Sequence, residues 1–150
     1  MSDHRELYQE TILDHSRTPR NKHGMPDANH HADGHNRLCG DKLSLYLKIK
    51  NGVIQDISFL GEGCAISTAS ASIMTETLKG KRIEDVAPLF ERFHNMVAGP
   101  VEKHEDEEVL GKLAVFSGVR EFPVRVKCAT LPWHTLQAAL KDQAKIVSTE

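Results

Sequence analysis

The clearest pattern in the chain is a strict alternation of apolar and polar residues over positions 43–50, the period of a half-buried β-strand. Asn51-Gly52 follows directly, and this pair favours a type I′ hairpin turn because both central residues of that turn need a positive φ. Apolar residues then return at positions 53, 57 and 59. We therefore predict a β-hairpin over positions 43–59.

Apolar residues at helical spacing, together with stop signals, predict helices on both sides of this hairpin. Positions 65–78 hold many small residues and no Pro or Gly, and Lys79-Gly80 is a typical helix end. We expect the first helix to end before Pro19, and Pro132 to lie in the first turn of the last helix. The expected helices cover about 7–15, 65–78, 83–93, 109–116 and 133–141.

The segment 18–38 is rich in Pro, Gly, Asn and His, and its composition predicts an irregular loop. A loop of this length within a domain is often functional. A third strand is expected, if anywhere, shortly before the last helix.

Two of the three cysteines stand where backbone geometry would expose a thiol. Cys39 comes directly before the first strand, and Cys64 lies between a Gly-rich strand end and the start of a helix. Helix N-termini carry a partial positive charge that favours thiolate over thiol. Cys128 is expected just upstream of the last helix, where Arg125 and Lys127 favour its anionic form. The alternative is that the three are unrelated core thiols.

Hairpin geometry brings Cys39 and Cys64 to the same end of the sheet, because the start of one antiparallel strand lies beside the end of the next. Asp41 can point to the same place, and a further thiolate from Cys128 would complete four ligands. Four ligands with sulfur preferred is the usual zinc coordination. The sequence therefore predicts a zinc site of Cys39, Asp41, Cys64 and Cys128.

Asp41 gives this site an unusual ligand set, because structural zinc is usually enclosed by Cys and His. A hard carboxylate among soft thiolates suggests a site that exchanges ligands. Alternatively, Asp41 only caps a turn or meets Lys42. His30, His31 and His35 offer a rival metal site, but we favour reading them as exposed imidazoles of a loop.

At these residues the chain resembles the IscU/NifU-like family, and specifically its SufU branch. The resemblance covers nearly the whole chain, and its most specific parts are the second and third of the following four motifs. The motifs are 12–15 with 19–22 (ILDH and PRNK), 39–41 (CGD), 61–67 (GEGCAIS) and 125–131 (RVKCATL). The resemblance implies an α+β fold, in which a small antiparallel β-sheet of about three strands packs against several helices.

Two features favour the SufU branch over the scaffold branch. Scaffold members carry His before the last cysteine, where this chain has Lys127, and the stretch from Cys64 to Cys128 is longer here, with an inserted segment at about 89–108. The chain departs from the family at Arg37, where Pro is usual, and at Pro132, where Ala is common. Arg37 is expected to loosen the loop that holds Cys39.

The resemblance implies a zinc-bound sulfurtransferase that accepts persulfide sulfur from a pyridoxal-phosphate-dependent cysteine desulfurase and serves downstream sulfur or cluster-assembly proteins. A desulfurase side chain, His by family analogy, is expected to replace one cysteine at the metal. Cys39 is the expected acceptor, and Arg125 is expected to contact the partner or the persulfide. Two alternatives stay open: a scaffold for a [2Fe–2S] cluster bound by the same residues with iron in place of zinc, and a non-catalytic zinc adaptor of the desulfurase.

The composition of the chain bears on its number of domains and its classes of partner, and not on the chemistry of the site. The 150 residues suit one domain, and a formal net charge of −2 gives no basic surplus for nucleic-acid binding. No apolar run approaches the ~20 residues that span a bilayer, and the first residues are polar. We therefore expect a single cytoplasmic domain with neither nucleic-acid nor membrane partners.

Overall fold

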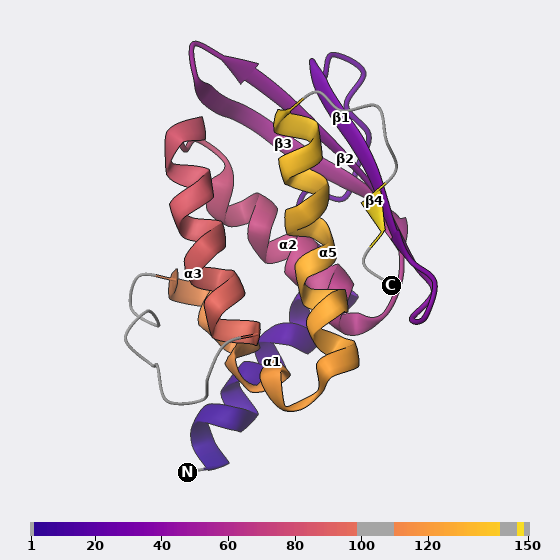
Figure 1. Ribbon diagram of the computed structural model, residues 1–150, viewed down its shortest axis with the longest axis vertical. Coiled ribbons are helices and arrows are strands. Elements are labelled where there is room, and N and C mark those ends of the chain that lie inside the picture. Colours follow the sequence, from indigo (N-terminus) through magenta and orange to yellow (C-terminus); the bar gives the residue numbers. More distant parts are fainter. Residues whose placement is uncertain (1, 99–109, 142–146, 149–150) are drawn as a thin grey trace.

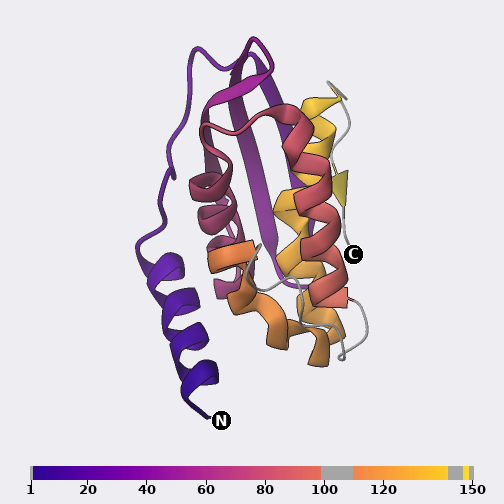
Figure 2. The same cartoon turned by 90° about the vertical axis from the view of Figure 1, so that its left-hand side faces the viewer.

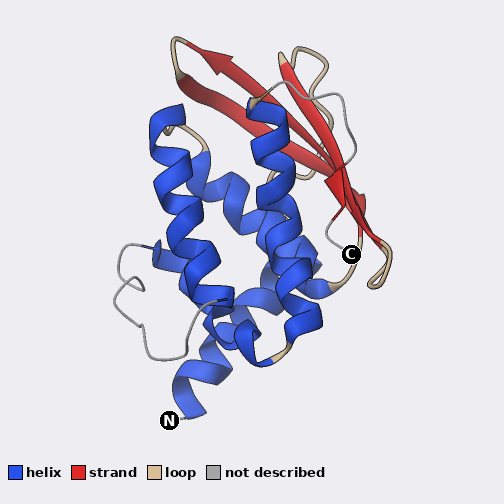
Figure 3. Cartoon of the chain, viewed as in Figure 1, coloured by secondary structure: helices blue, strands red, loops and turns tan. Residues whose placement is uncertain are grey.

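The computed structural model describes residues 2–98, 110–141 and 147–148 of the chain. Three antiparallel strands form a sheet on one side of the molecule, and the helices pack against one of its faces (Figures 1 and 3). The spatial order is β3-β2-β1-β4, in which the two-residue β4 pairs parallel to β1. The strands are β1 (His30–Asn36), β2 (Asp41–Lys50), β3 (Val53–Glu62) and β4 (Val147–Ser148). The predicted α+β class is confirmed.

The predicted hairpin is the β2–β3 pair. Leu47 lies opposite Ile57 in the register, and both side chains are fully buried beneath the helices. Asn51 and Gly52 have φ values of 54° and 75°, as a type I′ turn requires. The alternation of apolar residues therefore determines which face of this hairpin is buried.

β1 corrects the prediction of an irregular loop over 18–38, and the third strand lies here rather than before the last helix. Its inward positions are Ala32, Gly34 and Asn36, which are small or polar and give no apolar alternation. The reason is close packing: a Cβ on Gly34 would collide with Thr135 and approach Leu131. β1 therefore lacks large inward side chains because a helix passes directly over it.

The described chain also contains six helical segments, and the predicted helix over 65–78 is confirmed at both ends. α2 and α5 pack on the sheet, whereas α3 and η2 pack together on the side of α5 away from it. Trp133 of α5 stacks on Phe90 and Phe93 of α3, with ring centroids 5.6 Å and 5.0 Å apart. The segments are α1 (Ser2–Arg17), α2 (Ala65–Leu78), η1 (Ile83–Asp85), α3 (Val86–Ala98), η2 (Gly111–Glu121) and α5 (Pro123–Leu140).

α5 is twice as long as the last helix expected from the sequence. It begins at Pro123, and Pro132 lies inside it rather than in its first turn. Proline tends to end or kink helices, because it lacks the N–H that bonds four residues back. Here Pro132 is buried against the rest of the protein, and this packing outweighs the local preference.

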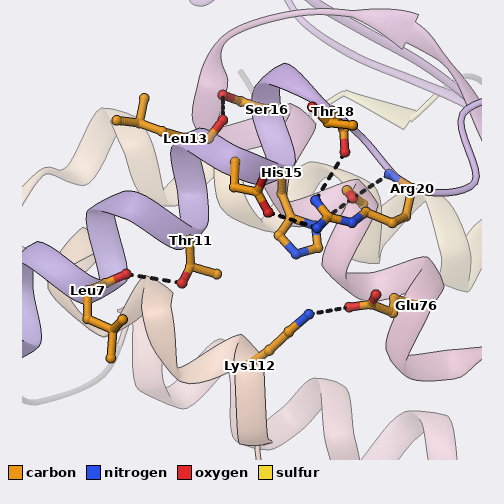
Figure 4. Close-up of polar contacts among 11 residues, drawn as sticks. Leu7, Thr11, Leu13, His15, Ser16, Thr18, Arg20, Glu76 and Lys112 are labelled. Atoms are coloured by element: carbon orange, nitrogen blue, oxygen red, sulfur yellow. Dashed lines mark hydrogen bonds and ion pairs between the residues drawn. The ribbon is translucent and has the colours of Figure 1, made fainter.

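α1 lies beside α2, at the lower left in Figure 2. In the last turn of α1, the buried His15 contacts α2, with its Nδ1 2.7 Å from Ser72 Oγ (Figure 4). The backbone N–H of Arg20 donates to the same hydroxyl at 2.9 Å, and the Arg20 guanidinium pairs with Asp14 at 2.7 Å. The end of α1 and the chain that follows are thus both bound to one serine of α2.

This contact predicts a dependence of stability on pH. Burial lowers the pKa of His15 below its ordinary value of 6.5, so the native state keeps His15 neutral while the unfolded chain protonates it first. The surrounding charges are Asp14, Arg20, Glu76 and Lys112. The unfolded state therefore binds more protons as pH falls below about 6.5, and stability drops by at most about 1.4 kcal/mol per pH unit from this group.

Thermal denaturation of the parent and of His15→Gln, from about pH 7.5 down to about pH 5, measures this effect. The glutamine amide can bond Ser72 but does not titrate, so the variant should lose less stability on acidification. Equal pH slopes for the two proteins would mean that His15 contributes nothing to the dependence.

Of the inserted segment predicted at about 89–108, positions 89–98 belong to α3 and the remainder lies outside the described residues. The insertion and the single-domain assignment therefore stay predictions. Among the described helices, none combines the length and the apolar character needed to cross a membrane.

Candidate metal centre

The turn between β1 and β2 presents Cys39 at its tip. Asn36 and Asp41 are the closing pair of the strands, and the turn is held by a hydrogen bond from Gly40 N–H to the Arg37 carbonyl at 3.3 Å. Gly40 has a φ of +70°, a conformation that glycine adopts without strain. Arg37 is part of this turn, and Cys39 is left half-buried.

Cys64 is the N-cap residue of α2, as the sequence predicted. Its backbone is extended, and its Sγ accepts a hydrogen bond from the Ser67 N–H at 3.5 Å. A sulfur in the position of an N-cap acceptor lies next to the partial positive charge of the helix N-terminus, which favours the thiolate.

Cys128 differs from its predicted place just upstream of the last helix, because it lies inside α5, in the second turn after Pro123. Its side chain is buried and faces the β1–β2 turn, with its Sγ 2.9 Å from the Sγ of Cys39. The Nδ2 of the buried Asn36 lies 3.9 Å from the same sulfur.

The ligand atoms of Cys39, Asp41 and Cys128 all lie within 4.8 Å of one another. Cys64 is outside this group of three but close to it, because its Sγ is 4.0 Å from Asp41 Oδ2. Within the described ranges this is the only cluster of at least three His, Cys, Asp or Glu side chains at metal-binding distances. The rival histidines stand apart: His31 contacts Asp33 at 3.0 Å and stacks on Tyr46.

Asp41 uses its two carboxylate oxygens differently. Oδ1 accepts hydrogen bonds from the Cys64 N–H at 2.8 Å and from the Ser67 hydroxyl at 3.0 Å. The other oxygen, Oδ2, is the one near the Cys64 sulfur. One oxygen of Asp41 therefore bonds groups at the start of α2, while the other lies on the side of the sulfurs. The alternative that Asp41 only caps a turn or meets Lys42 stays a prediction.

The three sulfurs influence one another's protonation. The pKa of Cys64 is lowered to about 6, chiefly by a hydrogen bond from the Cys128 thiol and further by the Ser67 N–H, against the opposing effect of burial. The pKa of Cys128 is raised by its role as donor to Cys64, by burial and by Cys39. Without a cation, the site thus favours Cys64 as the thiolate and keeps Cys128 protonated.

An open hollow of about 650 Å³ leads to Cys39 and Cys64. Three exposed apolar side chains surround it, Leu38, Phe122 and Val124. The hollow also includes Arg125, whose Nη1 is 4.0 Å from the Cys39 sulfur, and contact with Cys128 raises the pKa of this guanidinium. Arg125 therefore adds a cation to the mouth of the site.

The sequence reasoning missed the side chains that contact the proposed ligands from outside, Asn36 and Ser67. A signal exists for each. Asn36 directly precedes a turn and accepts a hydrogen bond from Leu38 N–H at 3.1 Å, the local bond that asparagine commonly forms. Ser67 stands three residues after the N-cap, where the first turn of a helix faces its cap.

A family model described as the NifU-like N-terminal domain matches residues 7–129 of this chain. The chain therefore belongs to the NifU-like N-terminal domain family, as its motifs indicated.

Relatives with different names share similar levels of identity. The chain is 41% identical over 137 residues to the zinc-dependent sulfurtransferase SufU of Bacillus subtilis strain 168, and the match covers 91% of each protein. It is 40% identical over 135 residues to the iron–sulfur cluster assembly scaffold protein IscU of Thermotoga maritima, covering 90% of this chain and 93% of the relative. Sequence identity alone therefore does not place the chain nearer to SufU than to IscU.

A solved structure confirms the fold implied by the resemblance. The putative iron–sulfur cluster assembly scaffold protein for the SUF system from Fervidobacterium islandicum AW-1 superimposes with a TM-score of 0.82 and 38% identity. The match covers 90% of this chain and 97% of the other.

Proposed function

We propose that this protein acts in iron–sulfur cluster assembly as a zinc-bound acceptor of sulfur from a cysteine desulfurase. The observation that carries the proposal is the convergence of Cys39, Asp41 and Cys128 within 4.8 Å, at the end of a hollow open to a partner. Family membership and relatives named for cluster assembly and for sulfur transfer support the same role.

The donor set fits zinc. The ligand atoms of Cys39, Asp41 and Cys128 lie within 4.8 Å of one another, and Cys64 stands beside them, with its Sγ 4.0 Å from Asp41 Oδ2. Sulfur with one carboxylate is within the range of zinc ligands. A bound zinc ion would stabilise these thiols as thiolates, including Cys128, whose pKa is otherwise raised.

Cys39 is the best-placed sulfur acceptor, because it lies at the tip of the β1–β2 turn, whereas Cys64, which is also half-buried, is bonded by the Ser67 N–H at the start of α2, and Cys128 is buried. Its thiolate would attack the terminal sulfur of the desulfurase cysteine persulfide. The new bond joins that sulfur to Cys39, the S–S bond of the donor breaks, and the desulfurase cysteine leaves as a thiolate, with no external oxidant or reductant needed. Arg125, 4.0 Å from this sulfur, would stabilise its negative charge.

The partner surface is the rim of exposed apolar residues Leu38, Phe122 and Val124 around the hollow. Exposed apolar side chains grouped beside a reactive site commonly mark an interface. A pyridoxal-phosphate-dependent cysteine desulfurase docked there would bring its persulfide to Cys39, and the accepted sulfur would pass on to downstream assembly proteins.

Metal analysis combined with desulfurase turnover tests this function. We expect about one zinc per purified chain, as for a single four-ligand site, and faster cysteine turnover when the protein is added to its desulfurase. Mass spectrometry should then find an added sulfur atom on the protein. Protein that takes up no zinc and leaves turnover unchanged would contradict the proposal.

A scaffold role is the second candidate, because the same thiolates suit a [2Fe–2S] cluster and a relative at 40% identity is named a scaffold. Lys127 counts against this role, because it stands exposed directly before Cys128, where the resemblance implies a histidine in scaffold members. Anaerobic reconstitution with iron and sulfide separates the two roles. Transfer of an intact cluster to an apo-protein would favour the scaffold, whereas persulfide formation without cluster binding favours the sulfur acceptor.

A further inference from the structure

Ser67 contacts two of the proposed ligands: Asp41, which is distant from it in sequence, and Cys64, which caps the same helix. It lies in the first turn of α2 and is 7% exposed. Its hydroxyl donates to Asp41 Oδ1 at 3.0 Å, and its backbone N–H donates to the Cys64 sulfur at 3.5 Å. A single residue thus links the carboxylate of the β1–β2 turn to the thiol at the helix start.

The hydroxyl determines how Asp41 faces the cysteines. With Oδ1 bound by Ser67 Oγ and by the Cys64 N–H, the carboxylate plane is set and Oδ2 is turned to the sulfur side, 4.0 Å from Cys64 Sγ. Gly63 leaves the space that this arrangement needs, because a Cβ there would collide with Asp41 Oδ1 and lie 2.7 Å from Ser67 Oγ.

We propose that Ser67 is a positioning residue of the metal centre: its hydroxyl holds Asp41 so that only Oδ2 is offered as a ligand. This inference rests on the proposed zinc site. A carboxylate that accepts two hydrogen bonds on one oxygen is restricted to binding through the other. Loss of the hydroxyl leaves the carboxylate free to rotate, so the site loses preorganisation and metal affinity.

Outer hydrogen-bond partners of metal ligands are commonly worth 10- to 100-fold in affinity. We expect Ser67→Ala to weaken Co²⁺ binding by about 10-fold, the lower end of that range, because the Cys64 N–H still holds Asp41. The variant keeps the backbone bond from residue 67 to the Cys64 sulfur, so it isolates the bond between hydroxyl and carboxylate.

The experiment is a titration of the full chain with Co²⁺, followed by its visible absorption, with affinity measured against a competing chelator. The d–d bands report ligand geometry, so Ser67→Ala should shift them as well as weaken binding. Ser70→Ala is the matched control: Ser70 is buried in the same helix, but its hydroxyl donates to the Ala129 carbonyl at 2.6 Å. This control should leave both the spectrum and the affinity unchanged.

A second pair of variants guards against a general loss of structure. Ser67→Thr keeps the hydroxyl, and Ser67→Val has nearly the shape of that threonine with a methyl group in place of the hydroxyl. We expect Ser67→Thr to retain the parent spectrum and Ser67→Val to lose it. Parent-like binding and spectra in both Ser67→Ala and Ser67→Val would overturn the role of Ser67 while leaving the proposed function intact. A parent protein that binds neither Co²⁺ nor Zn²⁺ would overturn both.

Discussion

The Cys39→Ser protein is expected to accept no sulfur and to lose all stimulation of the desulfurase, so that cysteine turnover falls to the level of the desulfurase alone. A serine hydroxyl has nearly the size of a thiol but is not ionised at neutral pH, so it cannot attack a persulfide. Cys64, Cys128 and Asp41 remain in place to hold zinc. The measurement is cysteine turnover by the desulfurase with the variant present, together with mass spectrometry of the variant for an added sulfur atom.

Leu38→Ser is the matched control for this variant. It places a serine in the same turn, at an exposed position, and leaves all three thiols untouched. We expect weaker docking, seen as a higher concentration for half-maximal stimulation, with Cys39 still accepting sulfur. An added sulfur on Cys64 or Cys128 of Cys39→Ser, with normal stimulation, would assign the acceptor role to another cysteine.

The parts of the site that follow from the sequence are those determined by local rules. The alternation over β2 and the Asn51-Gly52 turn define the hairpin, and the hairpin places Asp41 beside Cys64. The small residues of α2 and its stop at Lys79 define the helix that Cys64 caps. Local pattern and tertiary contact agree in this half of the molecule, so both the elements and their junction could be predicted.

β1 and α5 were not predictable from local pattern, for a shared physical reason. β1 has small inward residues because α5 passes over Gly34, and α5 continues through Pro132 because that residue is buried. Each element depends on the other, and neither shows the periodicity or the propensity of its own class. Tertiary packing overrides local preference here.

The missed strand β1 and the underestimated length of α5 both concern the site, because Cys128 belongs to α5 and Cys39 follows β1. The expectation that Cys128 joins the site came from the ligand count and the family motifs. The structure supplies the reason for the contact, since α5 packs along β1 and carries Cys128 to the end of that strand, 2.9 Å from the Cys39 sulfur. Asn36 and Ser67 contact the ligands only once these elements meet.

Removing zinc is expected to destabilise the protein strongly, because the proposed ligands come from three separate segments: the β1–β2 turn, the start of α2 and α5. A ligand that binds only the native state at about 1,000 times its dissociation constant contributes about 4 kcal/mol. For a chain of this size that corresponds to a fall in Tm of roughly 8–16 °C. Thermal denaturation with and without a strong chelator measures it.

The Cys39→Ala/Cys128→Ala double variant provides the control for zinc removal, since it lacks two of the proposed ligands and should melt at one temperature with or without chelator. Hydrogen exchange locates the effect: amides of residues 37–41 and of the first turns of α5 should exchange faster once the metal is removed, because the cation no longer ties the turn to the helix. In contrast, amides at the Asn51-Gly52 end of the hairpin, far along the strands from the cysteines, should be little affected. An unchanged Tm in protein known to lose its zinc to the chelator would show that the metal serves sulfur chemistry without stabilising the fold.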